Sequence, residues 1–181
     1  MRIIPNPEPG EYPPSASMYI DLIARDGRLL EHLAGARVAT TELVLALPEE
    51  KLLHRYAPGK WTIKEMLVHI VDDERIYSYR ALRFARDDRT PLPGFEQDPF
   101  AASSQANERP VADILAEYAA VREATIALFR GLPEAALLRS GVADGSRSTV
   151  RALGYHIAGH EAHHVRILQQ RYLGRESPRP S

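Results

Sequence analysis

The sequence predicts an all-α protein built as a four-helix bundle. Four long segments carry apolar residues at helical spacing, no segment alternates steadily between apolar and polar residues, and β-branched residues do not cluster between turn signals. The chain has 181 residues, enough for one domain with a full hydrophobic core. We expect the bundle over residues 18–174, preceded by an extended proline-rich arm (1–17) and followed by a short tail (175–181).

The first helix is expected from about Met18, or from a few residues later, to Leu47, where it ends before Pro48. Gly27 and Gly35 lie inside this stretch and lower its helix propensity. We nevertheless expect one helix along its whole length.

The second helix has a clear start signal. Thr62 and Glu65 have the spacing of a capping box, in which each side chain binds a backbone amide of the first turn. Trp61 and Met66 flank this cap at the spacing of a hydrophobic staple, which indicates a structural role for the single tryptophan. The helix is expected to continue to about Arg86.

A polar connector over residues 87–109 separates the second and third helices. Its length is unusual for a compact domain, so it is either a crossover or a loop that covers a site. Two more helices are expected after it, from about Pro110 to Gly131 and from a cap at Ser148 or Thr149 to just before Gly174.

Composition excludes several classes of function. Lys and Arg number 23 against 24 Asp and Glu, so the chain lacks the cationic field that binding to nucleic acid or an anionic membrane requires. The absence of cysteine excludes disulfides, thiolate metal sites and a cysteine nucleophile. No signal peptide and no apolar run of ~18 residues is present, so we expect a cytoplasmic protein that does not enter a membrane.

Four of the seven histidines lie within nine positions of the fourth helix. On a helical wheel His160 and His164 fall inside the apolar stripe, whereas His156 and His163 fall at its flank. His160 and His164 are one turn apart, so their rings can converge on one point. Two neutral imidazoles in a core need partners for their ring nitrogens, and two protonated ones would repel each other. A divalent metal ion resolves both difficulties.

A divalent site needs a third ligand, and the second helix offers His69 at the edge of its apolar stripe. Asp73 follows one turn later on the same side, with Asp72 further out. Either carboxylate is expected to bind an imidazole N–H or the metal itself, and the alternative is a solvated helix face. Glu74 falls within the stripe, so we expect it to be hydrogen-bonded, with Arg80 as a candidate partner, or to lie near the metal. His32 and His54 have no such companions, and we interpret both as ordinary histidines.

Residues 160–164, HEAHH, also match the H-E-x-x-H helix of zinc metalloproteases, with Glu161 as the general base. Such proteases usually take a third ligand downstream, and no histidine follows His164. A strand that holds the peptide is also not predicted. We keep a zinc peptidase as the less favoured alternative.

Three segments together resemble the DinB/YfiT-like family of metal-binding four-helix bundles. They are KWTIKEMLVHIVDDERIYSYRALRFAR, PLPGFEQDPF and LGYHIAGHEAHHVRIL, which in order and spacing cover about residues 20–173. The resemblance implies an up-down-down-up topology with a long crossover between helices two and three. It also implies a metal site formed by His69, His160 and His164, with His156 and His163 at variable positions outside it.

The resemblance implies two chemistries at such a site. Three neutral histidines leave the ion its +2 charge and an open coordination position, which is the layout of a catalytic site. Known family activities use low-molecular-weight thiols, as in S-transferases, and other members are called hydrolases. We therefore expect a small-molecule substrate, zinc as the first choice of metal and nickel as the second, and a homodimer. The competing hypothesis is a non-catalytic metal-binding or stress-response protein.

Overall fold

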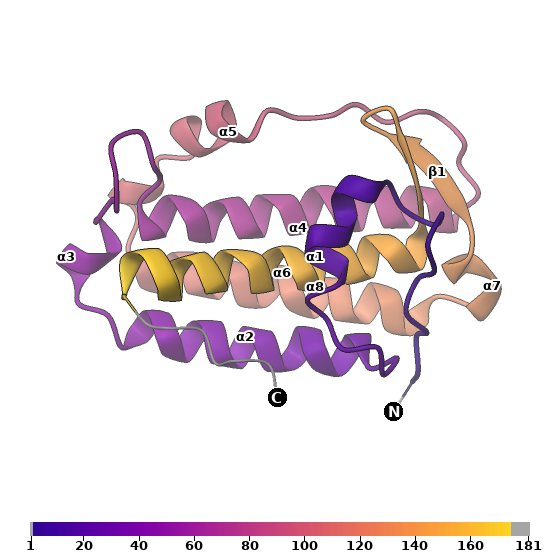
Figure 1. Ribbon diagram of the computed structural model, residues 1–181, viewed down its shortest axis with the longest axis horizontal. Helices are drawn as coiled ribbons and strands as arrows, with labels where there is room; N and C mark the ends of the chain where they lie inside the picture. Colours follow the sequence, from indigo (N-terminus) through magenta and orange to yellow (C-terminus); the bar gives the residue numbers. More distant parts are fainter. Residues whose placement is uncertain (1, 175–181) are drawn as a thin grey trace.

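Four long helices lie side by side and form the body of the molecule (Figure 1). The computed structural model describes residues 2–174, and the tail predicted at 175–181 lies outside the described residues. The long helices are α2 (Leu29–Leu45), α4 (Ile63–Ala85), α6 (Val111–Gly131) and α8 (Val150–Ile167). The shorter elements are α1 (Ser17–Ile20), α3 (Glu49–Leu52), α5 (Gln97–Ser103), α7 (Glu134–Leu137), β1 (Ser140–Ala143), β2 (Ser146–Thr149), two 3₁₀ turns (Pro14–Ala16 and Ala106–Glu108) and a π-helical turn (Leu168–Tyr172). The predicted four-helix bundle is confirmed.

Helix α4 begins as its capping box predicts. The backbone N–H of Glu65 donates to the Thr62 hydroxyl at 3.1 Å, and the backbone N–H of Thr62 donates to the Glu65 carboxylate at 2.8 Å. This reciprocal pair satisfies two amides that the first helical turn cannot pair internally. The start of the helix that carries His69 is therefore fixed by local sequence.

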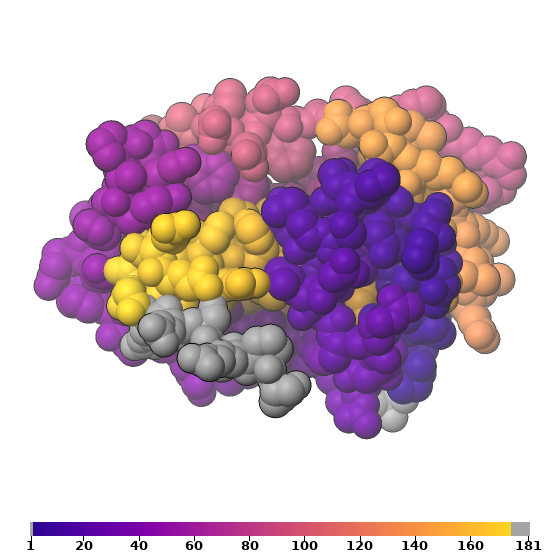
Figure 2. All heavy atoms as spheres, viewed as in Figure 1, coloured from indigo at the N-terminus to yellow at the C-terminus, as the bar shows by residue number. Residues whose placement is uncertain are grey.

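The prediction of one continuous helix over residues 18–47 is wrong. The chain leaves the helical conformation after α1 and enters α2 only at Leu29. Gly27 adopts a left-handed φ of +74°, and its carbonyl accepts a hydrogen bond of 2.9 Å from the backbone N–H of Ile4. This turn lets α1 lie across α8 as a separate element. Figure 2 shows the N-terminal segment, in indigo, covering that face of the molecule.

Close contact between α1 and α8 depends on a glycine. A Cβ atom added at Gly159 would overlap the backbone carbonyl of Tyr19. The missing side chain at Gly159 therefore lets the backbone of α1 approach α8 directly.

The prediction that the chain contains no strand is also wrong. Strands β1 and β2 form an antiparallel hairpin, in which Ser140 pairs with Thr149 and Ala143 with Ser146. Asp144 and Gly145 form the turn with φ values of 50° and 68°, as a two-residue hairpin loop requires. Helix α8 follows the hairpin without a linker, and the Thr149 hydroxyl accepts a hydrogen bond from the backbone N–H of Ala152.

The connector between α4 and α6 carries the chain back along the bundle (Figure 1). Near its end, Asn107 donates to the Glu65 carboxylate at 2.9 Å, and the Lys64 ammonium donates to the Arg109 carbonyl at 2.8 Å. Helix α6 therefore begins beside the start of α4. Within residues 2–174, none of the helices combines the length and apolarity needed to cross a bilayer.

Polar residues divide the hydrophobic core into two clusters. One cluster contains Leu29, Phe84, Phe129 and Leu153, and the other contains Val44, Ile63, Ile114 and Leu168. Helices α2, α4 and α6 contribute buried residues to both clusters, and α8 does so together with the π-helical turn that follows it. Buried polar side chains lie between the two contributions. These include Thr40 on α2, Asp73 and Glu74 on α4, Arg122 on α6, and His160 and Glu161 on α8. The predicted histidine site belongs to this polar layer.

Candidate metal centre

Helices α4 and α8 hold three imidazoles against one another. The Nε2 atom of His160 lies 3.1 Å from Nε2 of His69 and 3.1 Å from Nε2 of His164. One ring nitrogen from each of the three residues lies within 4.8 Å of the other two. The structure thus places together the three histidines that the sequence singles out, one from α4 and two that are one turn apart on α8.

Hydrogen bonds within the triad cannot satisfy all three rings. The Asp73 Oδ2 atom lies 3.3 Å from Nδ1 of His160 but forms no hydrogen bond there. In either neutral tautomer, Nε2 of His160 carries one proton or one lone pair, so it can form one well-aligned hydrogen bond with only one of its two neighbouring nitrogens. A cation between the rings would use the lone pairs of all three, so the donor set fits a divalent ion.

Burial keeps the three imidazoles neutral. It lowers the pKa of His69 to about 4 and that of His164 to about 3. Burial also holds the pKa of His160 well below its usual value, and the adjacent His164 and His69 act in the same direction. Neutral imidazoles keep the lone pairs that metal binding requires, so the site is ready to accept a cation at neutral pH.

Asp73 is the acidic residue that belongs to this site. It is buried on α4, and its Oδ2 atom also lies 3.8 Å from Nε2 of His156. Burial raises the pKa of the Asp73 carboxyl to about 8, whereas the positive charge of Arg80 opposes that rise. A cation bound by the nearby histidines would favour the ionised carboxylate in the same way.

The other two acidic candidates lie elsewhere. Asp72 is half-buried and lies 3.9 Å from the Arg75 guanidinium. Glu74 is buried and accepts hydrogen bonds of 2.9 and 2.8 Å from Arg122. Arg80, the expected partner of Glu74, instead donates to the Pro93 carbonyl at 3.0 Å. Glu74 is thus hydrogen-bonded, as expected, although its partner is Arg122. Among the described residues, neither Asp72 nor Glu74 has an oxygen within 4.0 Å of an imidazole nitrogen of the triad, so Asp73 is the acidic candidate that adjoins it.

Glu161 is not placed to act as a peptidase base. One of its oxygens accepts hydrogen bonds from Thr40, at 2.6 Å, and from Tyr118, and the other accepts one from Arg122 at 2.7 Å. Both oxygens are thus engaged in the buried polar layer, and Glu161 is fully enclosed. The geometry does not support the H-E-x-x-H interpretation.

Two aromatic residues complete the surroundings of the triad. The Trp61 ring centroid lies 4.6 Å from that of His69, and the Tyr19 ring centroid lies 5.4 Å from that of His160. The hydrophobic staple predicted for Trp61 does not include its contact with His69, although the position of Trp61 directly before the helix that carries His69 indicates that the two side chains can meet. No sequence pattern places Tyr19 beside His160, because a continuous first helix does not bring Tyr19 there.

A cavity of about 350 Å³ opens beside the triad. Its walls include Tyr19 from α1, Trp61, Asp98 from α5, and His163 and His164 from α8. The connector that contains α5 therefore helps to cover the site, in addition to returning the chain along the bundle. His163 faces this cavity, whereas His156 is buried and stacks on Tyr77 with ring centroids 3.9 Å apart.

Fold and site together define a helical bundle with a histidine triad between two of its helices. The chain belongs to the DinB superfamily, whose sequence profile matches residues 32–168. It is 30% identical over 126 residues to a protein of Oceanobacillus iheyensis named putative metal-dependent hydrolase. The aligned residues cover 68% of this chain and 72% of that protein. The resemblance inferred from the sequence is thereby confirmed.

A solved structure has the same fold. YfiT from Bacillus subtilis, described as a probable metal-dependent hydrolase with an unusual four-helix bundle topology, matches with a TM-score of 0.73. The match covers 85% of this chain and 91% of that one at 17% sequence identity. At this low sequence identity, the match shows that the two proteins share a fold.

Proposed function

We propose that this protein is a metal-dependent hydrolase of small molecules, with His69, His160 and His164 as the ligands of one divalent cation. The proposal is carried by one observation: the Nε2 atoms of three histidines lie against one another, and hydrogen bonds cannot satisfy them all. The names of the Oceanobacillus and Bacillus relatives agree with this class of activity.

The protein's own residues prepare the site for such chemistry. When bound, the cation supplies positive charge that lowers the pKa of a water or thiol at its open position. The Asp73 Oδ2 atom lies 3.3 Å from Nδ1 of His160, so an ionised Asp73 would favour a proton on that nitrogen and leave Nε2 free to hold the ion. Trp61 and Tyr19 enclose the rings, and the adjacent cavity of about 350 Å³ has room for a small substrate.

Transfer of a low-molecular-weight thiol is the alternative chemistry that the family resemblance implies. It uses the same three ligands and differs in the nucleophile. A protein that holds the ion without catalysis is the third possibility. We favour water because both relatives are named as hydrolases. Zinc remains our first choice of metal and nickel the second, since neutral imidazoles suit both. The homodimer stays a prediction for measurement of molecular mass in solution.

Metal analysis tests the ligands directly. The protein is stripped with a chelator, reloaded with zinc or nickel and desalted, and its metal content is measured by mass spectrometry. We expect one ion per chain in the wild type and none retained by His160→Ala or His164→Ala. His163→Ala is the matched control, because His163 adjoins His164 but lies outside the triad, and it should keep its ion. Full retention by His160→Ala would contradict the proposed site.

Cobalt substitution then separates the chemistries. A visible spectrum that shifts on addition of cellular thiols indicates thiol coordination and favours the transferase. No shift, together with cleavage of small ester or amide substrates that depends on the metal, supports the hydrolase. A loaded site with neither response identifies a non-catalytic binder.

A further inference from the structure

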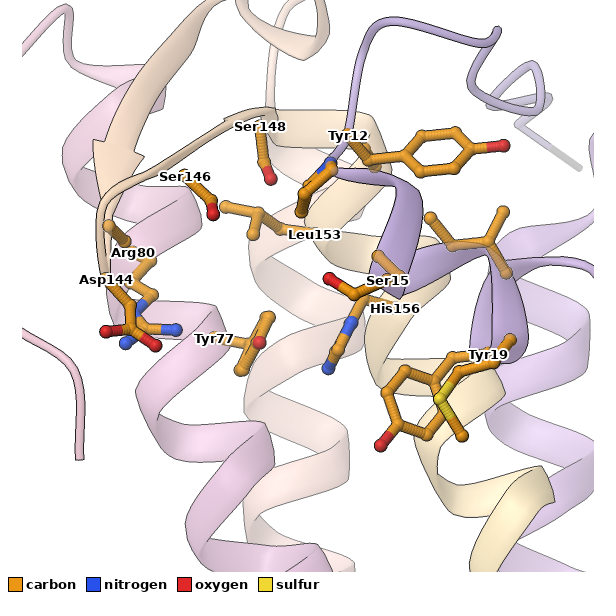
Figure 3. Close-up of a pocket in the computed structure, with 16 residues that line it drawn as sticks. Tyr12, Ser15, Tyr19, Tyr77, Arg80, Asp144, Ser146, Ser148, Leu153 and His156 are labelled. Atoms are coloured by element: carbon orange, nitrogen blue, oxygen red, sulfur yellow. The ribbon is translucent and has the colours of Figure 1, made fainter. Parts of the chain in front are cut away.

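A second cavity, of about 290 Å³, lies beside the hairpin. We call it the hairpin pocket. Figure 3 shows the residues that line it from four parts of the chain: Tyr77 and Arg80 from α4, His156 from α8, Ser146 and Ser148 from β2, and Tyr12 and Ser15 from the N-terminal segment. Tyr19 lines both this pocket and the cavity beside the metal site.

The walls of the hairpin pocket are fixed to one another. The Glu11 carboxylate accepts hydrogen bonds from the Arg151 guanidinium at 2.7 Å and from the Thr149 hydroxyl at 2.9 Å. The backbone N–H of Thr149 donates to the Glu11 carbonyl at 2.9 Å. These contacts join the N-terminal segment to the end of the hairpin and the start of α8. The pocket is therefore formed in advance of any ligand.

Arg80 is a buried cation that forms no ion pair in the part of the chain that the structure describes, and the Asp73 carboxyl acts on it only at longer range. Its exposed fraction is 5%, its Nη2 donates to the Pro93 carbonyl at 3.0 Å, and its guanidinium lies 4.9 Å from the Tyr77 ring centroid. Among residues 2–174, no carboxylate forms an ion pair with it within 4.0 Å. Arg122 is buried to a similar extent and has two carboxylate partners, Glu74 and Glu161.

The contrast between the two arginines points to a ligand. A buried charge without a counter-charge is unfavourable, because the low-dielectric interior does not replace the water it has lost. Arg122 avoids that cost through its two glutamates. Arg80 instead lines a cavity that it shares with the exposed Asp144, which forms no ion pair with it, so an anion that enters the cavity can supply a direct ionic contact.

We propose that the hairpin pocket binds a small molecule through a single carboxylate group, with Arg80 as its ionic partner. The planar guanidinium matches the geometry of a carboxylate, and its single positive charge balances a single negative one. The Ser146 and Ser148 hydroxyls add hydrogen-bond donors, while Tyr12 and Leu153 offer apolar surface to the body of the ligand. The exposed carboxylate of Asp144 at the edge of the pocket disfavours a doubly charged phosphate. This inference does not depend on the proposed metal site.

Calorimetric titration of the metal-free protein tests the pocket, since a chelator in the buffer removes any cation that a carboxylate could bind. The probes are acetate, butyrate, benzoate and phenylacetate, their carboxamides, and inorganic phosphate. We expect at least one carboxylate to bind with a stoichiometry of one. Its carboxamide and phosphate should bind at least about tenfold more weakly, because neither forms the same charge-assisted pair.

Two variants locate the binding. Arg80→Met should weaken carboxylate binding about 30-fold or more, because the charged partner is lost. Arg83→Met, one turn further along α4 and paired with Asp88 outside the pocket, should leave it unchanged. Ser15→Trp changes an exposed residue at the pocket edge and should block entry even if Arg80→Met does not fold. The proposal is overturned if none of the four carboxylates binds, if phosphate or the carboxamide binds equally well, or if binding persists in Ser15→Trp.

Discussion

The Asp73 carboxylate on α4 faces Nδ1 of His160 on α8 at 3.3 Å. The opposite nitrogen of that imidazole faces the rings of His69 and His164, so an ionised Asp73 would favour the tautomer in which Nε2 is available to a metal. The adjacent carboxylate, Asp72, lies on another face of the same helix near Arg75. Neighbouring residues of the same type thus have different roles.

Replacing Asp73 should weaken metal binding without removing a ligand. We expect Asp73→Asn to raise the zinc Kd about 10- to 100-fold, the usual effect of losing an acidic partner of a metal-bound histidine. Competition with a chromophoric chelator measures this constant. Asp72→Asn is the matched control and should leave the Kd unchanged. Equal effects of the two substitutions would show that Asp73 has no special relation to His160.

The depressed pKa of His69 predicts how acid destabilises the metal-free protein. Below pH 6.5 the unfolded chain takes up a proton at this residue, whereas the folded protein does so only near pH 4. Relative to His69→Asn, the wild type should therefore lose about 1.4 kcal/mol of unfolding free energy per pH unit as the pH falls from 6.5 to 4. Urea unfolding of both proteins in chelator, at several pH values, measures the difference. A constant difference across that interval would rule out the depressed pKa.

Removing Arg122 should destabilise the bundle strongly. Arg122→Met leaves the buried carboxylates of Glu74 and Glu161 without their cation, at an expected cost of about 3–5 kcal/mol in unfolding free energy. Arg75→Met removes a more exposed cation that pairs with Glu117, and its expected cost is below about 1 kcal/mol. Urea unfolding of the two variants at neutral pH makes the comparison. Similar losses in both would mean that the buried network contributes no more than a surface ion pair.

Two glycine substitutions should have opposite effects. Gly159→Ala places a Cβ atom against the Tyr19 carbonyl, so we expect α1 to move away from α8 and the protein to lose stability. Gly35→Ala lies within α2 with no neighbouring atom within 4 Å of the new Cβ, and it should gain about 1 kcal/mol. Thermal unfolding measures both changes, and faster amide exchange over residues 16–20 in Gly159→Ala alone would report the displacement of α1. Unchanged exchange there would show that α1 tolerates the added methyl group.

Local signals made the central helices and the triad predictable. The capping box at Thr62 determines where α4 begins, and the four-residue spacing of His160 and His164 on an apolar stripe directs both toward α4. The resemblance to the DinB-like proteins supplied His69. These features depend on short stretches of sequence, and for that reason they agree with the structure.

Contacts between distant segments account for the errors. The break at Gly27 is stabilised by Ile4, which lies outside the predicted helix. The two strands have four residues each, too few to show a clear alternation of apolar and polar residues. The Asp144-Gly145 pair is the one local signal of this hairpin, because Asp-Gly favours a two-residue turn. The partner of Glu74 comes from α6, so no pattern within α4 identifies Arg122.

Tyr19 lies outside residues 32–168, the part of the chain that matches the DinB superfamily, yet its ring contacts His160. The proposed metal ligands thus lie inside the segment that matches the superfamily, whereas one part of the cavity wall beside them comes from residues before that segment. Changes at Tyr19 would therefore alter the wall of the cavity beside the triad, while the helices that carry the three histidines keep their sequence.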